Sequence, residues 1–162
     1  IVIDTNNFTN QTGVRTFEAA AFLRRNGADV VRVRKLFRDD LDDYKAKAEA
    51  VREAEIFEGC FAISTCPSEG IESPTVVGAQ AANELLDIAG MKASIVMTFY
   101  NNTIYLSARS IDEVNVQVMM EKLGGGGHRT IAGAQLKDMS LEEARNRVKE
   151  VIRDMLEKGD IS

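Results

Sequence analysis

The sequence lacks features that multi-histidine metal sites, membrane-spanning helices and secretory signals require. It contains a single histidine, His128, which excludes a metal site built on several imidazoles from this chain alone. No apolar run approaches the ~18 residues that a membrane-spanning helix requires. No basic segment of the kind that begins a secretory signal opens the chain. The first residue is Ile1 and not Met, so we expect the sequence to be part of a longer protein.

An excess of positive charge is also missing. The 20 Lys and Arg residues stand against 25 Asp and Glu residues, for a net charge of -5. We therefore expect no long nucleic acid as partner, whereas a small anionic ligand needs only a few donors. Hydrophobic residues make up 44% and charged residues 28%, a globular balance. A chain of 162 residues is close to one domain of about 150 residues.

Cysteine is scarce, and its two positions argue against a disulfide. Cys60 and Cys66 lie six residues apart in an apolar run that reads as extended. At about 3.3 Å per residue they would be ~20 Å apart, beyond the reach of a disulfide. We predict reduced thiols in an intracellular protein.

The first 37 residues predict a strand, a helix and a second strand. Residues 1–3 read as a strand followed by a polar turn, and residues 28–33 as a valine-rich strand. Between them Thr16 can cap a helix that runs to Asn26, with Gly27 as its stop. So short a segment cannot bury a core alone, and we expect it to need a neighbour that this chain does not contain.

The remaining residues predict a second, larger domain. Residues 38–54 read as an exposed amphipathic helix that links two domains, and residues 56–65 as a strand. Ser73 and Pro74 start a helix that ends before Gly90, and residues 115–123 form a short helix. An extended stretch follows to Leu136, and Ser140 with Glu143 caps a last helix.

A hairpin over residues 91–110 is the clearest local pattern. Asn101 and Asn102 suit a two-residue turn, since Asn tolerates positive φ. This register pairs Phe99 with Ile104, Met97 with Leu106, and Ile95 with Ala108 on a core face. The opposite face is polar and carries Tyr105, Ser107 and Arg109.

The run Gly124–Gly127 with His128 is the most informative segment. Four ordered glycines cost backbone entropy, so a folded domain needs a geometric reason to keep them. Glycine amides can form an anion nest, a phosphate can approach without meeting a Cβ, and His128 can donate to the same anion. Alternatively, Gly124 is a helix C-cap, the other glycines are a mobile loop and His128 is a surface residue.

Two further residues have competing interpretations. Arg109 can hold a phosphate through two parallel hydrogen bonds, or it is a solvated or ion-paired surface residue. Asp4 follows the first predicted strand, where a carboxylate can coordinate a divalent metal. Alternatively, Asp4 forms an Asx turn onto the backbone of Asn6.

These segments resemble a known family. The run Gly124–Gly127 with His128, followed by Ala132-Gly133-Ala134, resembles the signature of the DHHA1 domain of DHH-type phosphoesterases. Residues 4–8 are similar to the last metal-binding motif of the preceding DHH domain. Residues 17–25 and 107–128 resemble the GdpP-type cyclic-di-AMP phosphodiesterases in particular.

The resemblance implies a fold, a reaction and a ligand set. The expected fold is α/β, with a DHHA1-type mixed sheet flanked by helices over residues 38–162 and a strand-helix-strand remnant of a DHH domain over residues 1–37. It implies a bacterial signalling hydrolase in which two manganese ions activate water and cyclic di-AMP is converted to linear pApA. The glycine run, His128 and Arg109 would bind substrate phosphate, and Asp4 would be a manganese ligand.

The chain departs from this pattern, because the Asp-x-Asp and Asp-His-His motifs of the family are absent. We therefore expect this part alone to be inactive and to need the missing DHH lobe of the same chain. It would be a soluble cytoplasmic part of a membrane-anchored protein, and a homodimer stays open. The alternatives are a nanoRNase-like hydrolase of short linear oligonucleotides, or a non-catalytic nucleotide-binding or interaction module.

Overall fold

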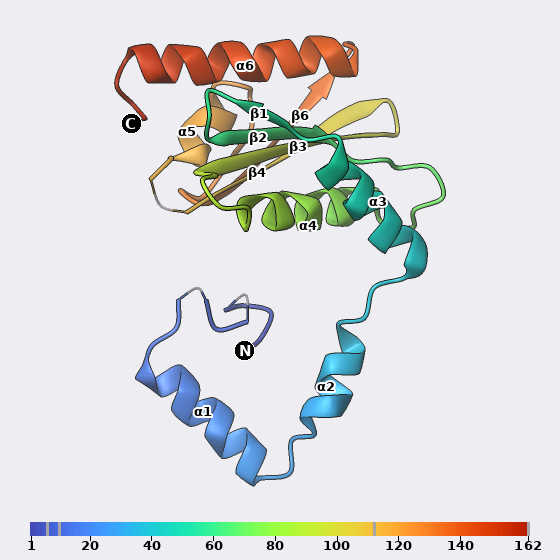
Figure 1. Cartoon of the computed structure of the whole chain (residues 1–162), viewed down its shortest axis with the longest axis vertical. Coiled ribbons are helices and arrows are strands. Elements are labelled where there is room, and N and C mark those ends of the chain that lie inside the picture. The colour runs from blue at the N-terminus through green and yellow to red at the C-terminus, as the bar shows by residue number, and fades with distance from the viewer. Residues whose placement is uncertain (6, 10, 112, 162) are drawn as a thin grey trace. The chain divides into compact units, whose positions relative to one another are not determined.

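A computed structural model describes residues 1–5, 7–9, 11–111 and 113–161. The chain divides into two compact units, Ile1–Asp39 and Asp40–Ser162 (Figure 1). We call them unit 1 and unit 2 and describe each by itself. In the part of the chain that the structure describes, no helix combines the length and apolar character needed to cross a membrane.

Unit 1 is helical, which corrects both strands predicted there. Residues 1–3 lie in hydrogen-bonded turns, in which the amide of Thr5 donates to the carbonyl of Ile1. Helix α1 spans Val14–Arg25, and the valine-rich segment is helix α2, Val30–Leu36. Asp29 accepts hydrogen bonds from two amides of the first turn of α2, and this cap outweighs the strand preference of the valines.

The helix α1 begins earlier than predicted, at a glycine cap. Gly13 is the N-cap, and Thr16 lies at the third helical position, from which its hydroxyl accepts a hydrogen bond from the Gly13 amide. The end of the helix at Asn26 and Gly27 is as predicted, with Gly27 at φ +94°.

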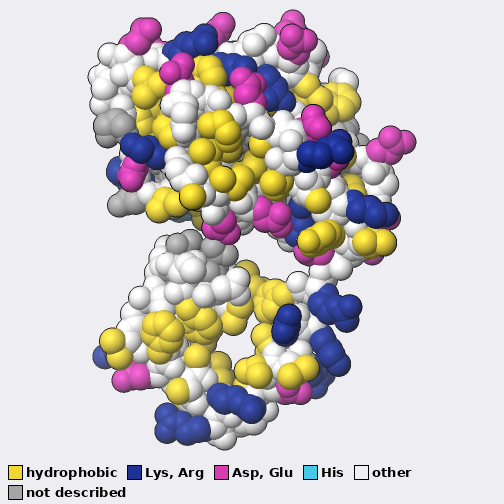
Figure 2. Space-filling model, viewed as in Figure 1, with side chains coloured by type: hydrophobic (Ala, Val, Ile, Leu, Met, Phe, Trp, Pro, Cys, Tyr) yellow, Lys and Arg dark blue, Asp and Glu magenta, His cyan; other side chains and the backbone are white. Residues whose placement is uncertain are grey.

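Apolar side chains of unit 1 remain at its surface. Every residue of α1 and α2 is at least partly exposed, and Val14, Phe22 and Leu36 are among the most exposed. The rings of Phe8 and Phe17 stack with centroids 5.4 Å apart. Figure 2 shows hydrophobic side chains spread over the visible surface of this unit. The described residues of unit 1 therefore form no hydrophobic core of their own, in keeping with the short length of this unit.

Unit 2 begins with helix α3, Leu41–Arg52, which starts at an Asp40 cap. We predicted an exposed linking helix here, but α3 buries Ala46, Lys47 and Ala50. It packs beside α4, Pro74–Leu86, where the buried Lys47 lies 3.2 Å from Glu84. The helix is thus an integral part of unit 2.

Six strands of the described residues form one mixed sheet in the order β1-β2-β3-β4-β6-β5. Their bounds are β1 Glu55–Phe57, β2 Phe61–Thr65, β3 Ala93–Tyr100, β4 Thr103–Ser110, β5 Gly126–Gly127 and β6 Ile131–Lys137. The single strand predicted over residues 56–65 is two antiparallel strands, because Glu58 and Gly59 take φ values of +49° and +75° and reverse the chain. Only β2 and β3 pair in parallel.

The β3–β4 hairpin has the predicted register and turn. Phe99 pairs with Ile104 and Ile95 with Ala108, and both turn residues, Asn101 and Asn102, have positive φ. The second face was predicted to be polar, and on β3 it is covered by α4. Ser94 donates a hydrogen bond to the Ala82 carbonyl there.

Helices cover both faces of the sheet. Helices α3 and α4 pack on one face, and α5, Val116–Glu121, and α6, Leu141–Glu157, pack on the other (Figure 1). Pro74 begins α4 as predicted, although the Ser73 side chain makes no capping hydrogen bond. The predicted Ser140–Glu143 capping box of α6 is present.

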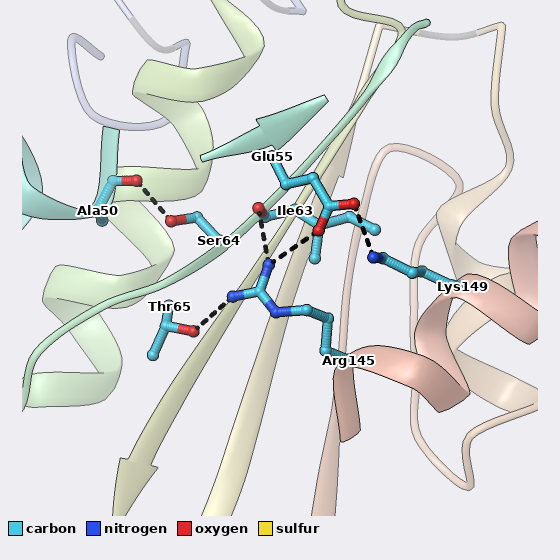
Figure 3. Close-up of polar contacts among 7 residues, drawn as sticks. All are labelled: Ala50, Glu55, Ile63, Ser64, Thr65, Arg145 and Lys149. Atoms are coloured by element: carbon cyan, nitrogen blue, oxygen red, sulfur yellow. Dashed lines mark hydrogen bonds and ion pairs between the residues drawn. The ribbon is translucent and has the colours of Figure 1, made fainter. Parts of the chain in front are cut away.

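A polar cluster joins α6 to the first two strands (Figure 3). Arg145 donates to the hydroxyl of Thr65 over 3.0 Å and lies 3.6 Å from Glu55. Lys149 donates to the other carboxylate oxygen of Glu55 over 2.6 Å and also lies over the ring of Phe57. These contacts hold the last helix against the β1 edge of the sheet.

Candidate nucleotide site

The face of the sheet that carries α4 is only half covered. On β4 the side chains of Tyr105, Ser107 and Arg109 are partly exposed, while the intervening residues are buried on the opposite face. On β6 the matching positions are Ile131, Gly133 and Gln135, all at least partly exposed. Strands β4, β6 and β5 therefore present an open surface beside α4.

Cross-strand pairing arranges this open surface in three rows. The first row joins Arg109 to Ile131, and Ile131 to His128, with which it exchanges two backbone hydrogen bonds. The second row joins Ser107, Gly133 and Gly126, and the third joins Tyr105 and Gln135. Successive rows are about 7 Å apart, because residues two apart on a strand face the same side.

Arg109 in the first row is a cation whose two hydrogen-bond acceptors are neutral. Its Nε donates to Oδ1 of Asn83 on α4 over 2.9 Å, and its Nη1 donates to the carbonyl of Ala108 over 2.9 Å. Both acceptors are neutral, and no carboxylate among the described residues lies within ion-pair distance. Burial lowers the pKa of this guanidinium below its ordinary value. A half-buried, unneutralised arginine of this kind is suited to bind an anion.

The glycine run differs from the predicted nest of successive amides. The amides of Gly124 and Gly125 donate to carbonyls of α5, at Glu121 and Met120. The amide of His128 donates to the carbonyl of Ile131 over 2.7 Å. These three amides are therefore engaged within the protein and do not form a nest.

The edge of the sheet leaves one amide of the run pointing outward. Since His128 and Ile131 form a hydrogen-bonded pair, the next pair, Gly127 with Ala132, is of the non-hydrogen-bonded type. The amide of Gly127 then faces away from β6, and β5 is the last strand of the sheet. This N–H lies next to His128, whose side chain is exposed.

Packing explains two of the four glycines, a φ of +78° explains Gly124, and Gly126 is left without a structural reason. A Cβ on Gly127 would lie 2.5 Å from Cα of Ala132, and one on Gly125 would overlap the carbonyl of Gly133. A Cβ on Gly126 would meet nothing within 4 Å. Gly126 lies in the second row, so its missing side chain keeps the open surface clear.

A pocket of about 380 Å³ occupies the end of this surface away from Arg109. Its walls come from α4, β4, β6 and the loop that follows α5, and none of its lining residues is charged: Thr75, Tyr105, Leu106, Ser107, Gly124, Gly125, Gly133, Ala134 and Gln135. Ser107 and Gly133 of the second row line this pocket and separate it from the first row, which contains Arg109.

A second pocket, of about 450 Å³, is less suited to an anion. It lies between α3 and the loop before α4, and Asp42, Glu49 and Glu69 line it against one cation, Lys45. Its negative charge opposes phosphate binding.

Asp4 lies in unit 1, and the structure assembles no metal centre around it. Its carboxylate is exposed. Over the described ranges, no group of three His, Cys, Asp or Glu residues is placed to hold a metal ion. The alternative Asx turn to Asn6 falls outside the described residues. The described residues therefore do not form a complete manganese site by themselves.

The sequence pattern placed the β4 side chains on one face but did not predict their partners on other elements. The hairpin register placed Tyr105, Ser107 and Arg109 on one face, as the structure shows. Asn83, which orients Arg109, lies 26 residues earlier in the chain, and no local pattern connects the two. Gln135 could have been found by extending the register from β4 to β6.

Comparisons with known proteins find relatives of this chain. A family model described as the DHHA1 domain matches residues 59–157, which contain the pocket, Arg109 and the glycine run. The cyclic-di-AMP phosphodiesterase GdpP of Geobacillus thermodenitrificans is 44% identical over 160 residues, which are 98% of this chain and 24% of that protein. The chain spans about a quarter of the length of the first curated relatives it matches.

A more distant relative and a solved structure complete the comparison. The bifunctional oligoribonuclease and PAP phosphatase NrnA of Thermus thermophilus is 38% identical over 69 residues, 43% of this chain and 21% of that protein. An exopolyphosphatase-related protein from Bacteroides fragilis shares the fold, with a TM-score of 0.83 at 18% identity over 95% of this chain and 47% of that one.

Proposed function

We propose that this chain, which belongs to the DHHA1 domain family, supplies the substrate-binding surface of a phosphodiesterase that hydrolyses cyclic di-AMP to pApA. The observation that carries the proposal is the guanidinium of Arg109, which has no anionic partner among the described residues and lies in the same row as His128. The high identity to proteins named cyclic-di-AMP phosphodiesterases supports the choice of nucleotide.

The first row supplies the contacts for a substrate phosphate. The Cα atoms of Arg109 and His128 are about 10 Å apart, since two strand spacings separate them. Arginine and histidine side chains reaching inward from that separation can contact one phosphate between them. The outward amide of Gly127 adds a backbone donor at the sheet edge, and Gly126 leaves the approach clear.

The division of the whole protein into lobes is part of the proposal. Residues 1–37 would be the end of a DHH lobe, and residues 38–162 the DHHA1 lobe with its connecting helix. The exposed apolar side chains of unit 1 would pack against the rest of the DHH lobe. Manganese would be held mainly by ligands from outside these 162 residues, with Asp4 as one ligand.

Binding measurements test this proposal on the chain as it is. Calorimetric titration with pApA is expected to show binding by the wild type. Arg109→Ala and His128→Ala should weaken it by about tenfold or more, the value of a charge-assisted hydrogen bond. Arg153→Ala is a matched control, since Arg153 lies on α6 near Glu58 and Phe57. Failure of wild type to bind pApA at millimolar concentration would contradict the proposal.

A second candidate, hydrolysis of short linear oligonucleotides, is favoured by the similarity to NrnA over 69 residues. The two are separated by the rates of the intact protein on cyclic di-AMP and on pApA. Faster turnover of pApA would select the second candidate. The 162 residues alone should hydrolyse neither substrate, with or without added manganese.

A further inference from the structure

Beyond the phosphate contacts, the open surface contains a neutral compartment whose chemistry matches one part of a nucleotide. The pocket at the third row has no charged lining residue, although it adjoins the cationic first row. A phosphate gains little in such a pocket, whereas an uncharged aromatic group is favoured there. A nucleotide is therefore expected to lie with its phosphate at the first row and its uncharged base in the pocket.

We propose that Tyr105 and Gln135 form an adenine-binding pair, with the Tyr105 ring as stacking surface and the Gln135 amide as reader of the base edge. This inference rests on the proposed function, because it takes the phosphate to be held at Arg109 and His128. Tyr105 and Gln135 are directly opposite on β4 and β6 and both line the pocket.

The spacing of the rows fits one nucleotide. From Arg109 to Tyr105 the strand advances about 14 Å, in two steps of about 7 Å. A phosphate in the first row puts the ribose over the second row and the base over the third. The second row has almost no side chains, since Gly133 and Gly126 lie beside Ser107. A sugar ring can therefore lie flat on this part of the sheet, with the Ser107 hydroxyl beside it.

The side chains of the third row are available for a ligand. Tyr105 is partly buried and lines the pocket. Gln135 is exposed, and its amide makes no hydrogen bond to another described residue. Stacking on an aromatic ring stabilises a bound base of any identity.

The amide of Gln135 supplies the discrimination between bases. A glutamine amide carries a donor and an acceptor side by side, which match the N7 acceptor and N6 donor of adenine. Guanine presents two acceptors, O6 and N7, at the same edge, so one of them would face the amide oxygen. The pair therefore favours adenine over guanine.

Three small probes separate this inference from the proposed function. Ribose 5-phosphate tests the phosphate site alone, AMP adds adenine, and GMP replaces adenine with guanine. We expect AMP to bind the wild type at least about fivefold more tightly than either other probe. Tyr105→Ala and Gln135→Leu should each reduce AMP affinity by about fivefold or more and leave ribose 5-phosphate unchanged.

Matched variants and a wild-type measurement keep the test independent of folding. Tyr105→Phe retains the ring and should bind AMP like the wild type, as should Tyr44→Ala on the exposed face of α3. In wild-type protein, nuclear magnetic resonance should show shifts of the Tyr105 ring and the Gln135 side-chain amide with AMP but not with ribose 5-phosphate.

The outcomes are distinct. Equal affinity of the wild type for AMP, GMP and ribose 5-phosphate would overturn the adenine-binding pair and leave the phosphate site standing. Equal shifts of Tyr105 and Gln135 with AMP and ribose 5-phosphate would also overturn the adenine-binding pair, because these side chains would then respond to a ligand that has no base. Absence of binding by all three probes would overturn the proposed function, and this inference with it.

Discussion

Nε of Arg109 donates a hydrogen bond to Oδ1 of Asn83 over 2.9 Å, from strand β4 to helix α4. The acceptor is an uncharged amide, so it orients the guanidinium without neutralising it. Helix α4 covers one half of this face of the sheet, and the contact between Asn83 and Arg109 lies where the cover ends. Asn83 is therefore at the border between the covered and the open half. The residue acts on a ligand through Arg109 and is a positioning residue.

Substitutions of Asn83 should separate the effect of orienting the Arg109 guanidinium from the effect of neutralising its charge. Asn83→Ala removes one neutral hydrogen bond, and pApA affinity should fall about fivefold. Asn83→Asp places a carboxylate against Arg109 and should weaken pApA binding more, by about tenfold or more, while thermal unfolding shows no loss of stability. Titration calorimetry beside differential scanning fluorimetry measures both. Unchanged affinity of the Asn83→Asp protein would contradict the assignment of Arg109.

The glycines of the run should respond differently to alanine. Gly127→Ala and Gly125→Ala force a Cβ into the backbone of β6 and should each lower the free energy of unfolding by about 1–3 kcal/mol. Gly126→Ala meets open space and should leave stability unchanged or raise it by about 0.4–1 kcal/mol. Urea denaturation of the three variants checks this order. A Gly126→Ala protein as unstable as Gly127→Ala would show that the described β5–β6 packing is wrong.

The Gly126→Ala variant also tests the role of the open surface. Because the added methyl group enters the second row, we expect weaker binding of pApA with no loss of stability. A variant with wild-type affinity would show that the ligand does not approach this row.

The cluster around Glu55 predicts a pH dependence of stability. The hydrogen bond from Lys149 holds the pKa of Glu55 below its ordinary value of 4.5. A depressed carboxyl pKa stabilises the fold fully above about pH 5, and this stabilisation is lost as the pH falls through the lowered value. Since Glu55 is partly exposed, this stabilisation amounts to less than about 1 kcal/mol. Comparison of wild type with Glu55→Gln from pH 7 to pH 3 should show a difference that disappears in acid; a constant difference would refute this account.

The two thiols should differ in reactivity. Burial raises the pKa of Cys66 to about 11, and Cys66 is almost fully buried beside α3. The pKa of Cys60 is also raised by burial, but its side chain is partly exposed. Iodoacetamide at pH 8 should therefore modify Cys60 first, as read by mass spectrometry of peptides. Equal labelling of both thiols in the folded protein would contradict the packing of β2 against α3.

Local signals predicted much of unit 2, because there the sequence pattern and the tertiary contacts agree. The Asn101-Asn102 turn fixed the β3–β4 register, and the Ser140–Glu143 box fixed the start of α6. The free cysteines are as predicted. These features depend on residues close together in the chain.

Where the structure differs from the sequence predictions, a cap or a tertiary contact outweighs the local pattern of residues. Valines favour a strand over residues 28–33, but the Asp29 cap starts a helix there. The polar side chains of β3 predicted a polar face opposite the core, but Ser94 and Thr98 on this face are buried. Gly78 approaches Thr98 so closely that a Cβ would overlap its hydroxyl. Likewise, the glycine run is shaped by strand pairing as much as by any ligand, which composition alone could not show.

A crystal structure of this chain with pApA tests the central claim most directly. The account predicts a phosphate in contact with the Arg109 guanidinium and the His128 side chain, over the surface that Gly126 leaves clear. A phosphate that contacts neither side chain, with the ligand bound elsewhere on unit 2, would contradict it.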